Sequence, residues 1–188
     1  MSAGFPRRKH PRLDGYDYSL PGAYFVTVNV AGERCLLSEI RVGRGLAPAE
    51  VRLSGLGRIV EEELLALPRR YPGVAVERYV IMPNHIHLIL LVDDTAAGGT
   101  SKAPSPTNAV TPHFVSTLKR FCHRDAGKEI FQRSYHDHVI RDEEDYLKIW
   151  KYIDNNPARW QEDCFYAEQS SQAAEGAALY NIPTEETL

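Results

Sequence analysis

The most informative part of the sequence is the stretch Tyr79-Val80-Ile81-Met82-Pro83-Asn84-His85-Ile86-His87-Leu88-Ile89-Leu90. It belongs to two runs of β-branched, aromatic and other apolar residues, 74–82 and 86–92, which have the composition of strands. Pro83 and Asn84 separate the two runs, and these residue types are common in turns. The stretch therefore predicts an antiparallel hairpin.

Two histidines lie on the second strand of this hairpin. His85 and His87 are two residues apart, so their side chains project from one face, while Ile86 points to the opposite face and can enter the core. Neutral imidazoles at this spacing suit two adjacent ligands of one metal ion. Two ordinary surface histidines produce the same pattern, and a bare His-x-His does not separate these interpretations.

The segments on either side alternate between strand and helix patterns. Ser54 precedes apolar residues at helical spacing, and Pro68 closes that segment. Asp142 is a suitable N-cap for a last helix, which Pro157 ends at Asn156. The expected elements are strands over 23–30, 35–42 and 135–140, a loop over 43–49, and helices over 54–67, 112–126 and 143–156. This order predicts an α+β fold with helices packed on one face of an antiparallel sheet.

Charge is unevenly distributed along the 188 residues. The net charge is −3, but residues 1–160 carry all 22 Lys and Arg, whereas 161–188 carry acids and neither Lys nor Arg. We interpret 1–160 as one domain with a basic arm over 1–15 and a flexible loop over 93–112, followed by an acidic tail over 161–188. The mean charge argues against a nucleic-acid partner, but its distribution permits one.

The last helix carries a tyrosine suited to phosphodiester chemistry. Tyr152 and Asn156 are four residues apart and share a helical face. A tyrosine that cleaves a phosphodiester needs a metal ion to polarise the phosphate, and a residue one turn further on can supply a ligand. Tyr146 lies about 600° of helical rotation earlier, so only one of the two tyrosines can face the histidines, and we favour Tyr152. A half-buried core tyrosine is the alternative interpretation.

Several separated motifs resemble one family, in the same order along the chain. They are Tyr79–Leu90 with its Met-Pro-Asn-His-Ile-His core, the segment from Phe131 to Asp145, the run Tyr152-Ile153-Asp154-Asn155-Asn156-Pro157, and the segment from Leu13 to Thr27. Together they resemble the single-tyrosine (Y1) HUH transposases, in particular the REP-associated tyrosine transposase branch. The resemblance covers about residues 7–163.

The resemblance implies a ferredoxin-like fold that acts on single-stranded DNA, often beside a hairpin. It implies that His85 and His87 bind Mg²⁺ or Mn²⁺ and that Tyr152 attacks the scissile phosphate, which leaves a 5′-phosphotyrosine link and a free 3′-OH. Asn156 stands where insertion-sequence relatives carry a glutamine as third metal ligand, and it is one methylene shorter. A homodimer and a monomer both occur among such relatives, so both stay open.

Basic residues mark a candidate DNA-binding surface. A short run of charge also suits a solvated helix face, and that interpretation stays open. His136 and His138 share one face of their strand and can line the site. The residues that we expect to contact DNA are Lys119, Arg120, Arg124, Arg133 and Arg141 in the domain, with Arg7, Arg8, Lys9 and Arg12 in the basic arm.

Two other functions remain open at this point. One is a catalytically inactive protein of the same fold that binds hairpin or single-stranded DNA, and the other is a metal-dependent hydrolase that activates water. No carboxylate lies on the strand with the histidines, which disfavours the hydrolase. Three scattered cysteines, and the lack of an apolar run near the ~18 residues that span a bilayer, predict a soluble, cytoplasmic protein without a membrane partner.

Overall fold

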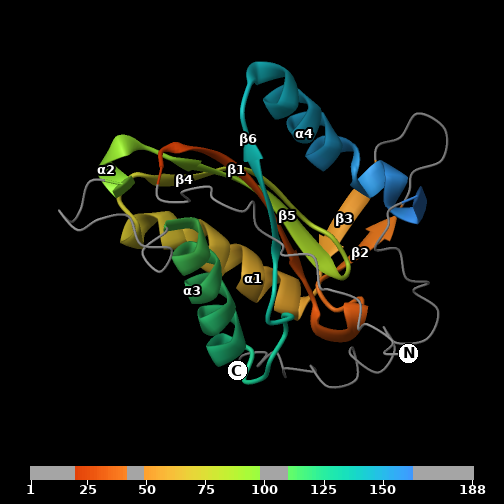
Figure 1. The fold of residues 1–188 in the computed structure, drawn as a ribbon. Helices are drawn as coiled ribbons and strands as arrows, with labels where there is room; N and C mark the ends of the chain where they lie inside the picture. The colour runs from red at the N-terminus through yellow and green to blue at the C-terminus, as the bar shows by residue number, and fades with distance from the viewer. Residues whose placement is uncertain (1–19, 42–48, 98–109, 163–188) are drawn as a thin grey trace, which may run out of the picture.

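The computed structural model describes residues 20–41, 49–97 and 110–162 (Figure 1). Within them, the main sheet has the strand order β4-β5-β1-β6, and all neighbouring strands are antiparallel. These strands are Gly22–Asn29 (β1), Val74–Ile81 (β4), His85–Val92 (β5) and His136–Ile140 (β6). With α1 after β1 and α3 after β5, the order is that of a ferredoxin-like β-α-β-β-α-β unit.

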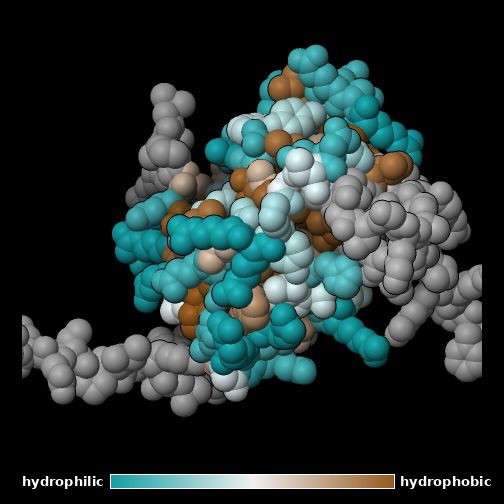
Figure 2. Space-filling model, turned by 90° about the vertical axis from the view of Figure 1, so that its left-hand side faces the viewer, coloured by the Kyte–Doolittle hydropathy of each residue, from teal (hydrophilic) through white to brown (hydrophobic). Residues whose placement is uncertain are grey.

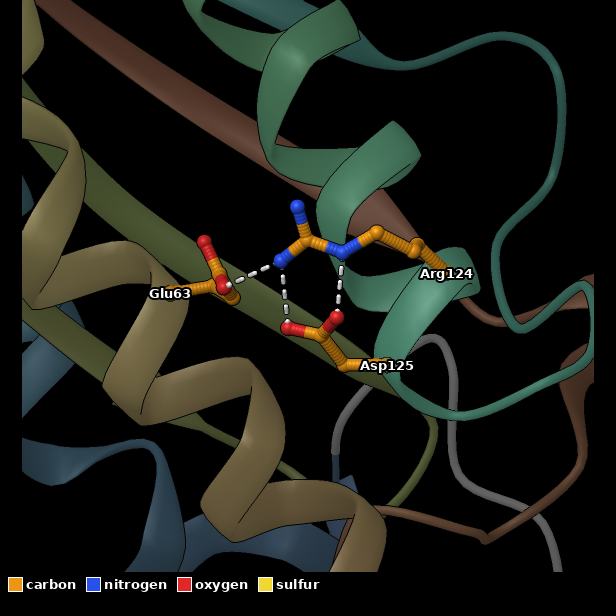
Figure 3. Close-up of polar contacts among 3 residues, drawn as sticks. All are labelled: Glu63, Arg124 and Asp125. Atoms are coloured by element: carbon orange, nitrogen blue, oxygen red, sulfur yellow. Dashed lines mark hydrogen bonds and ion pairs between the residues drawn. The ribbon is translucent and has the colours of Figure 1, made fainter.

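One face of the sheet packs against α1 (Gly55–Ala66) and α3 (Val110–Asp125). Alternate residues of β1, such as Tyr24, Val26 and Val28, are fully buried on this face because the side-chain period of a strand is two. Arg124 of α3 links the two helices, since its Nη2 donates to Oε1 of Glu63 at 3.2 Å and its guanidinium also pairs with Asp125 (Figure 3). This arrangement matches the helices that the sequence predicted on one face.

A further helix, α4 (Glu143–Asn155), packs on the other face of the sheet (Figure 1). Its residues Ile149 and Ile153 are buried and, four positions apart, form an apolar stripe. They pack with Ile89 of β5 and Phe25 of β1. Helices therefore cover both faces, so the prediction of helices on one face holds for α1 and α3 but not for α4.

The ends of α4 agree with the sequence analysis. The Asp142 side chain accepts a hydrogen bond from the Asp145 backbone N–H at 2.8 Å, as expected of an N-cap. The helix ends at Asn155 with Asn156 as its C-cap, directly before Pro157, and a 3₁₀ segment, Pro157–Glu162, follows. The expected bounds of this helix are confirmed.

Two stretches outside the predicted strands and helices contain short regular elements. The predicted strand over 35–42 is confirmed by Ser38–Arg41 (β2), which pairs with Glu50–Leu53 (β3), a four-residue strand that the sequence analysis did not assign because it is too short to show clear alternation. A short helix, Asp94–Ala97 (α2), and the first turn of α3 lie within 93–112, so the flexible loop predicted there is too long at both ends. The basic arm over 1–15 and all but the first two residues of the predicted tail lie outside the described residues.

The described surface is largely polar where Figure 2 views it, with hydrophobic residues in small separate patches. This agrees with the enclosed core on the α1–α3 side of the sheet, where strand and helix residues are fully buried. No described helix is both long enough and apolar enough to cross a membrane.

Candidate active site

His85 and His87 converge on one point of the α4 face. Both lie on β5, are 0% and 2% exposed, and hold their Nε2 atoms 2.9 Å apart. The two-residue spacing brings the rings to one face, and the tight turn before His85 fixes where the strand begins, since the Met82 backbone N–H donates to the His85 carbonyl at 2.9 Å. The two imidazoles thus form a pair of nitrogen donors.

Asn84 fixes the tautomer of His85. Its Nδ2 donates to the carbonyl of Glu33 at 3.2 Å, which orients the carboxamide so that Oδ1 faces His85 Nδ1 at 2.9 Å. A carboxamide oxygen only accepts hydrogen bonds, so Nδ1 of His85 carries the hydrogen. In the neutral ring, Nε2 of His85 then carries the lone pair, which is the form that binds a metal ion.

His87 has partners on both sides. Thr27 is its register partner on β1, with Oγ1 2.8 Å from His87 Nδ1. The Tyr152 hydroxyl lies 3.3 Å from His87 Nε2. Burial, and then the nearby His85, hold the pKa of His87 well below its ordinary value. The ring is therefore neutral at pH 7, as a metal ligand must be.

Of the two candidate tyrosines, Tyr152 is the one beside the histidines. Its ring centroid lies 5.2 Å from that of His87 and 6.1 Å from that of Phe25, and 42% of the residue is exposed. Tyr146 instead donates its hydroxyl hydrogen to Glu77 of β4 at 3.2 Å. The helical rotation between the two residues separates them as the sequence predicted.

Asn156 is buried at the C-cap of α4, one turn after Tyr152. It helps to line a groove of about 520 Å³ next to the tyrosine. Trp160, in the 3₁₀ segment that follows, packs its ring 6.1 Å from that of His85. The end of α4 therefore lies close to the histidine pair.

The donors present fit a divalent cation that accepts nitrogen and oxygen ligands. Among the described residues, no group of three His, Cys, Asp or Glu side chains is placed to hold a metal ion, so a cation held by the two imidazoles would need oxygen ligands of another kind. Asn29 stands opposite His85 in the β1–β5 register, and its buried Oδ1 has no hydrogen-bond partner among the described residues. A carboxamide oxygen of this kind is a suitable ligand for Mg²⁺ or Mn²⁺.

Lys119, one of the predicted DNA-binding residues, lines the groove between α3 and the segment before β6 but is largely buried. It is 8% exposed, and its ammonium donates to the carbonyls of Gln132, Arg133 and Ser134 at 2.8, 3.3 and 2.8 Å. Burial lowers the pKa of Lys119 to about 8. Its three hydrogens hold the segment before β6 in place, so none is left for a phosphate.

The other predicted basic residues are placed differently. Arg124 is exposed but paired with Glu63 and Asp125. Arg120 and Arg133 are exposed and line a groove of about 770 Å³ between α3 and the segment before β6. Arg141 is exposed as well, and Arg7, Arg8, Lys9 and Arg12 lie outside the described residues.

The histidines of β6 have unequal positions. His136 is exposed and pairs in register with Thr27, so it lies on the same sheet face as His87, two strands away on the far side of β1. His138 is tied to α4 by its Nε2, which lies 2.7 Å from Oδ2 of Asp145. His136 is therefore an exposed residue on the site's face of the sheet, whereas His138 anchors the tyrosine helix.

Sequence analysis missed two lysines and three buried polar residues, which are Thr27, Asn29 and Asn84. Lys148 and Lys151 line the groove beside Tyr152. Lys148 lies four positions before Tyr152 and so shares the helical face of Tyr152, which was a usable signal in the sequence. Lys151 lies one position before Tyr152, and its spacing gave no such signal. Thr27 and Asn84 contact the histidine rings, and only the strand register and the turn reveal them.

Comparisons with known proteins agree with this fold. No family model matches the chain. A curated protein of Haemophilus influenzae (strain ATCC 51907 / DSM 11121 / KW20 / Rd), described as uncharacterized, is 32% identical over 184 residues, which span 89% of this chain and 97% of that protein. The solved structure of a REP-associated tyrosine transposase bound to a REP hairpin matches 74% of this chain and 68% of its own, with a TM-score of 0.53 and 21% identity. The fold expected from the sequence resemblance is therefore confirmed.

Proposed function

The chain belongs to the same family as the Haemophilus influenzae protein and shares the fold of a REP-associated tyrosine transposase, and from this premise we propose that it is a transposase-like enzyme that nicks and joins single-stranded DNA. One observation carries the proposal: the Tyr152 hydroxyl lies 3.3 Å from His87 Nε2, which lies 2.9 Å from His85 Nε2. A nucleophile and a pair of metal-binding nitrogens thus meet on one sheet face.

In this proposal His85 and His87, with the carboxamide of Asn156, hold Mg²⁺ or Mn²⁺. When bound, the ion polarises the scissile phosphate and neutralises its charge. Tyr152 Oη loses its proton and forms a bond to phosphorus while the bond from phosphorus to the 3′ oxygen breaks, and the 3′ oxygen takes up a proton, so that this DNA fragment is released with a 3′-OH. The 5′-phosphotyrosine link keeps the energy of the phosphodiester for rejoining. Partial exposure of Tyr152 gives a DNA strand access to the hydroxyl.

Exposed cations on both sides of the sheet suggest how the DNA is held. Lys148 and Lys151 stand beside Tyr152, where the scissile phosphate must bind. Arg120 and Arg133 line the larger groove near the start of β6 and suit contacts to flanking phosphates. In this proposal the substrate is single-stranded DNA next to a hairpin, and it reaches both grooves.

The test is a covalent-adduct assay. A labelled single-stranded oligonucleotide with a hairpin is incubated with the protein and Mn²⁺, and the products are separated under denaturing conditions. We expect a labelled protein band that is lost on chelation of the metal. Cleavage without an adduct would support a water-activating hydrolase instead, and binding without cleavage would support an inactive DNA-binding protein.

The variants Arg120→Ala and Lys119→Met separate surface charge from buried charge. Arg120→Ala removes one proposed phosphate contact, so it should lower the slope of log affinity against log salt by about one while stability stays unchanged. Lys119→Met leaves three carbonyls without their donor, so it should lower the free energy of unfolding by about 2 kcal/mol. Filter binding over a salt series and urea denaturation measure the two effects. A Lys119→Met protein with full stability would contradict the buried role.

A further inference from the structure

We propose that Thr27 is a positioning residue which lets His87 change tautomer when a divalent cation binds between the two histidines. The inference rests on the metal site of the proposed function and extends it to a residue outside the ligand set. Three observations carry it: the contact between the two Nε2 atoms, the fixed tautomer of His85, and the hydroxyl at Nδ1 of His87.

The contact between the rings requires one hydrogen. Two nitrogen lone pairs 2.9 Å apart repel each other, so one Nε2 must donate to the other when no cation is present. His85 cannot be the donor in its neutral form, because Asn84 Oδ1 keeps its hydrogen on Nδ1. Nε2 of His87 therefore carries the hydrogen, and Nδ1 of His87 is an acceptor. Thr27 donates its hydroxyl hydrogen to that Nδ1.

A cation between the rings needs the opposite arrangement at His87. Both Nε2 atoms must then present lone pairs, so His87 loses the hydrogen at Nε2 and gains one at Nδ1, with no net change in its protons. Nδ1–H now needs an acceptor, and the same Thr27 oxygen supplies it after the hydroxyl hydrogen rotates away. A hydroxyl serves both states because it can donate and accept, whereas a carbonyl can only accept.

The position of Thr27 allows this role without movement of the backbone. It is 5% exposed and directly opposite His87 in the β1–β5 register, so the strand pairing holds the two groups together. Valine has nearly the shape of threonine and a high strand propensity. Thr27→Val should therefore fold normally while it leaves Nδ1 of His87 without a partner. Thr27→Ser keeps the hydroxyl.

The experiment has two readouts that do not involve DNA. Long-range ¹H–¹⁵N spectra of the metal-free wild type should show the hydrogen on Nδ1 of His85 and on Nε2 of His87. Addition of Zn²⁺, a diamagnetic ion that imidazole binds well, should move the His87 hydrogen to Nδ1. Calorimetric titration with Mn²⁺ should show about 10-fold weaker binding for Thr27→Val and near-wild-type binding for Thr27→Ser.

Thr111→Val is the matched control. Thr111 is also fully buried, and its Oγ1 has no hydrogen-bond partner among the described residues, but it lies on α3, against the other face of the sheet. Its replacement should leave Mn²⁺ affinity unchanged, which separates loss of the Thr27 contact from loss of any buried hydroxyl.

The outcomes distinguish this proposal from the proposed function. Three results would each overturn the role of Thr27. They are a hydrogen already on Nδ1 of His87 in the metal-free protein, wild-type Mn²⁺ affinity in Thr27→Val, and no binding of Mn²⁺ or Zn²⁺ to the wild type. DNA adduct formation in the same protein would leave the proposed function standing. The converse result is the expected tautomer change without an adduct on any hairpin substrate. It would support the positioning role of Thr27 and contradict the proposed DNA-nicking function.

Discussion

We expect Tyr152→Phe to lower formation of the covalent DNA adduct by about 1000-fold or more, because it removes the only atom of the side chain that can bond to phosphorus. The ring keeps its contacts with Phe25 and His87, and 42% of the residue is exposed, so the variant should unfold at the wild-type temperature. Mn²⁺ affinity and binding of uncleaved hairpin DNA should both remain. The assay is the denaturing-gel adduct measurement, run with binding and melting curves on the same preparation.

Tyr146→Phe is the matched control on the same helix. It removes a hydroxyl that contacts Glu77 on β4, away from the histidine pair. The adduct should form at the wild-type level in this variant. An adduct that persists in Tyr152→Phe and disappears in Tyr146→Phe would reverse the assignment of the nucleophile.

The sequence predicts the hairpin and the tyrosine helix because local rules decide both. Strand composition and a two-residue turn place β4 and β5, and one N-cap with one proline sets the ends of α4. The choice of Tyr152 over Tyr146 depends only on helical geometry, which is also local. The part of the site that follows from spacing along the chain was therefore predictable.

The residues around the rings depend on contacts between distant segments. Thr27 meets His87 across 60 positions of sequence, through a strand register that neither residue reveals alone. Asn84 was visible as a turn residue, but its orientation depends on the carbonyl of Glu33. The buried position of Lys119 also depends on distant contacts. From the sequence, a lysine on a helix is expected to be exposed to solvent, and only the fold shows the three carbonyls that accept hydrogen bonds from it.

The close approach of α1 to the segment before β2 connects the packing of the core with the histidine pair. The backbone at Leu37 accepts a hydrogen bond from the Ser54 N–H and donates one to the Pro83 carbonyl, both at 2.9 Å. Pro83 belongs to the turn that positions Asn84 and, through it, His85. Gly57 on α1 faces Leu37 directly, so the volume at this one position affects both packing and the turn.

Gly57→Ala should lower the free energy of unfolding by about 2–3 kcal/mol, although alanine is the better helix former by about 1 kcal/mol. A Cβ at position 57 would lie 2.0 Å from the Leu37 carbonyl oxygen and 3.3 Å from Leu53 Cβ. A backbone carbonyl that is held by Ser54 cannot rotate away, so the helix must move outward.

Gly55→Ala, two positions earlier in the same helix, supplies the control because a Cβ there meets nothing within 4 Å. It should stabilise the protein by about 0.5–1 kcal/mol through helix propensity alone. Urea denaturation of the two variants should thus give shifts of opposite sign. Gly57→Ala should also weaken Mn²⁺ binding, because a displaced Leu37 disturbs the Pro83 carbonyl contact and the turn that holds His85. Equal stability of the two variants would show that α1 adjusts freely against Leu37, and the link between this packing contact and the histidine pair would then be absent.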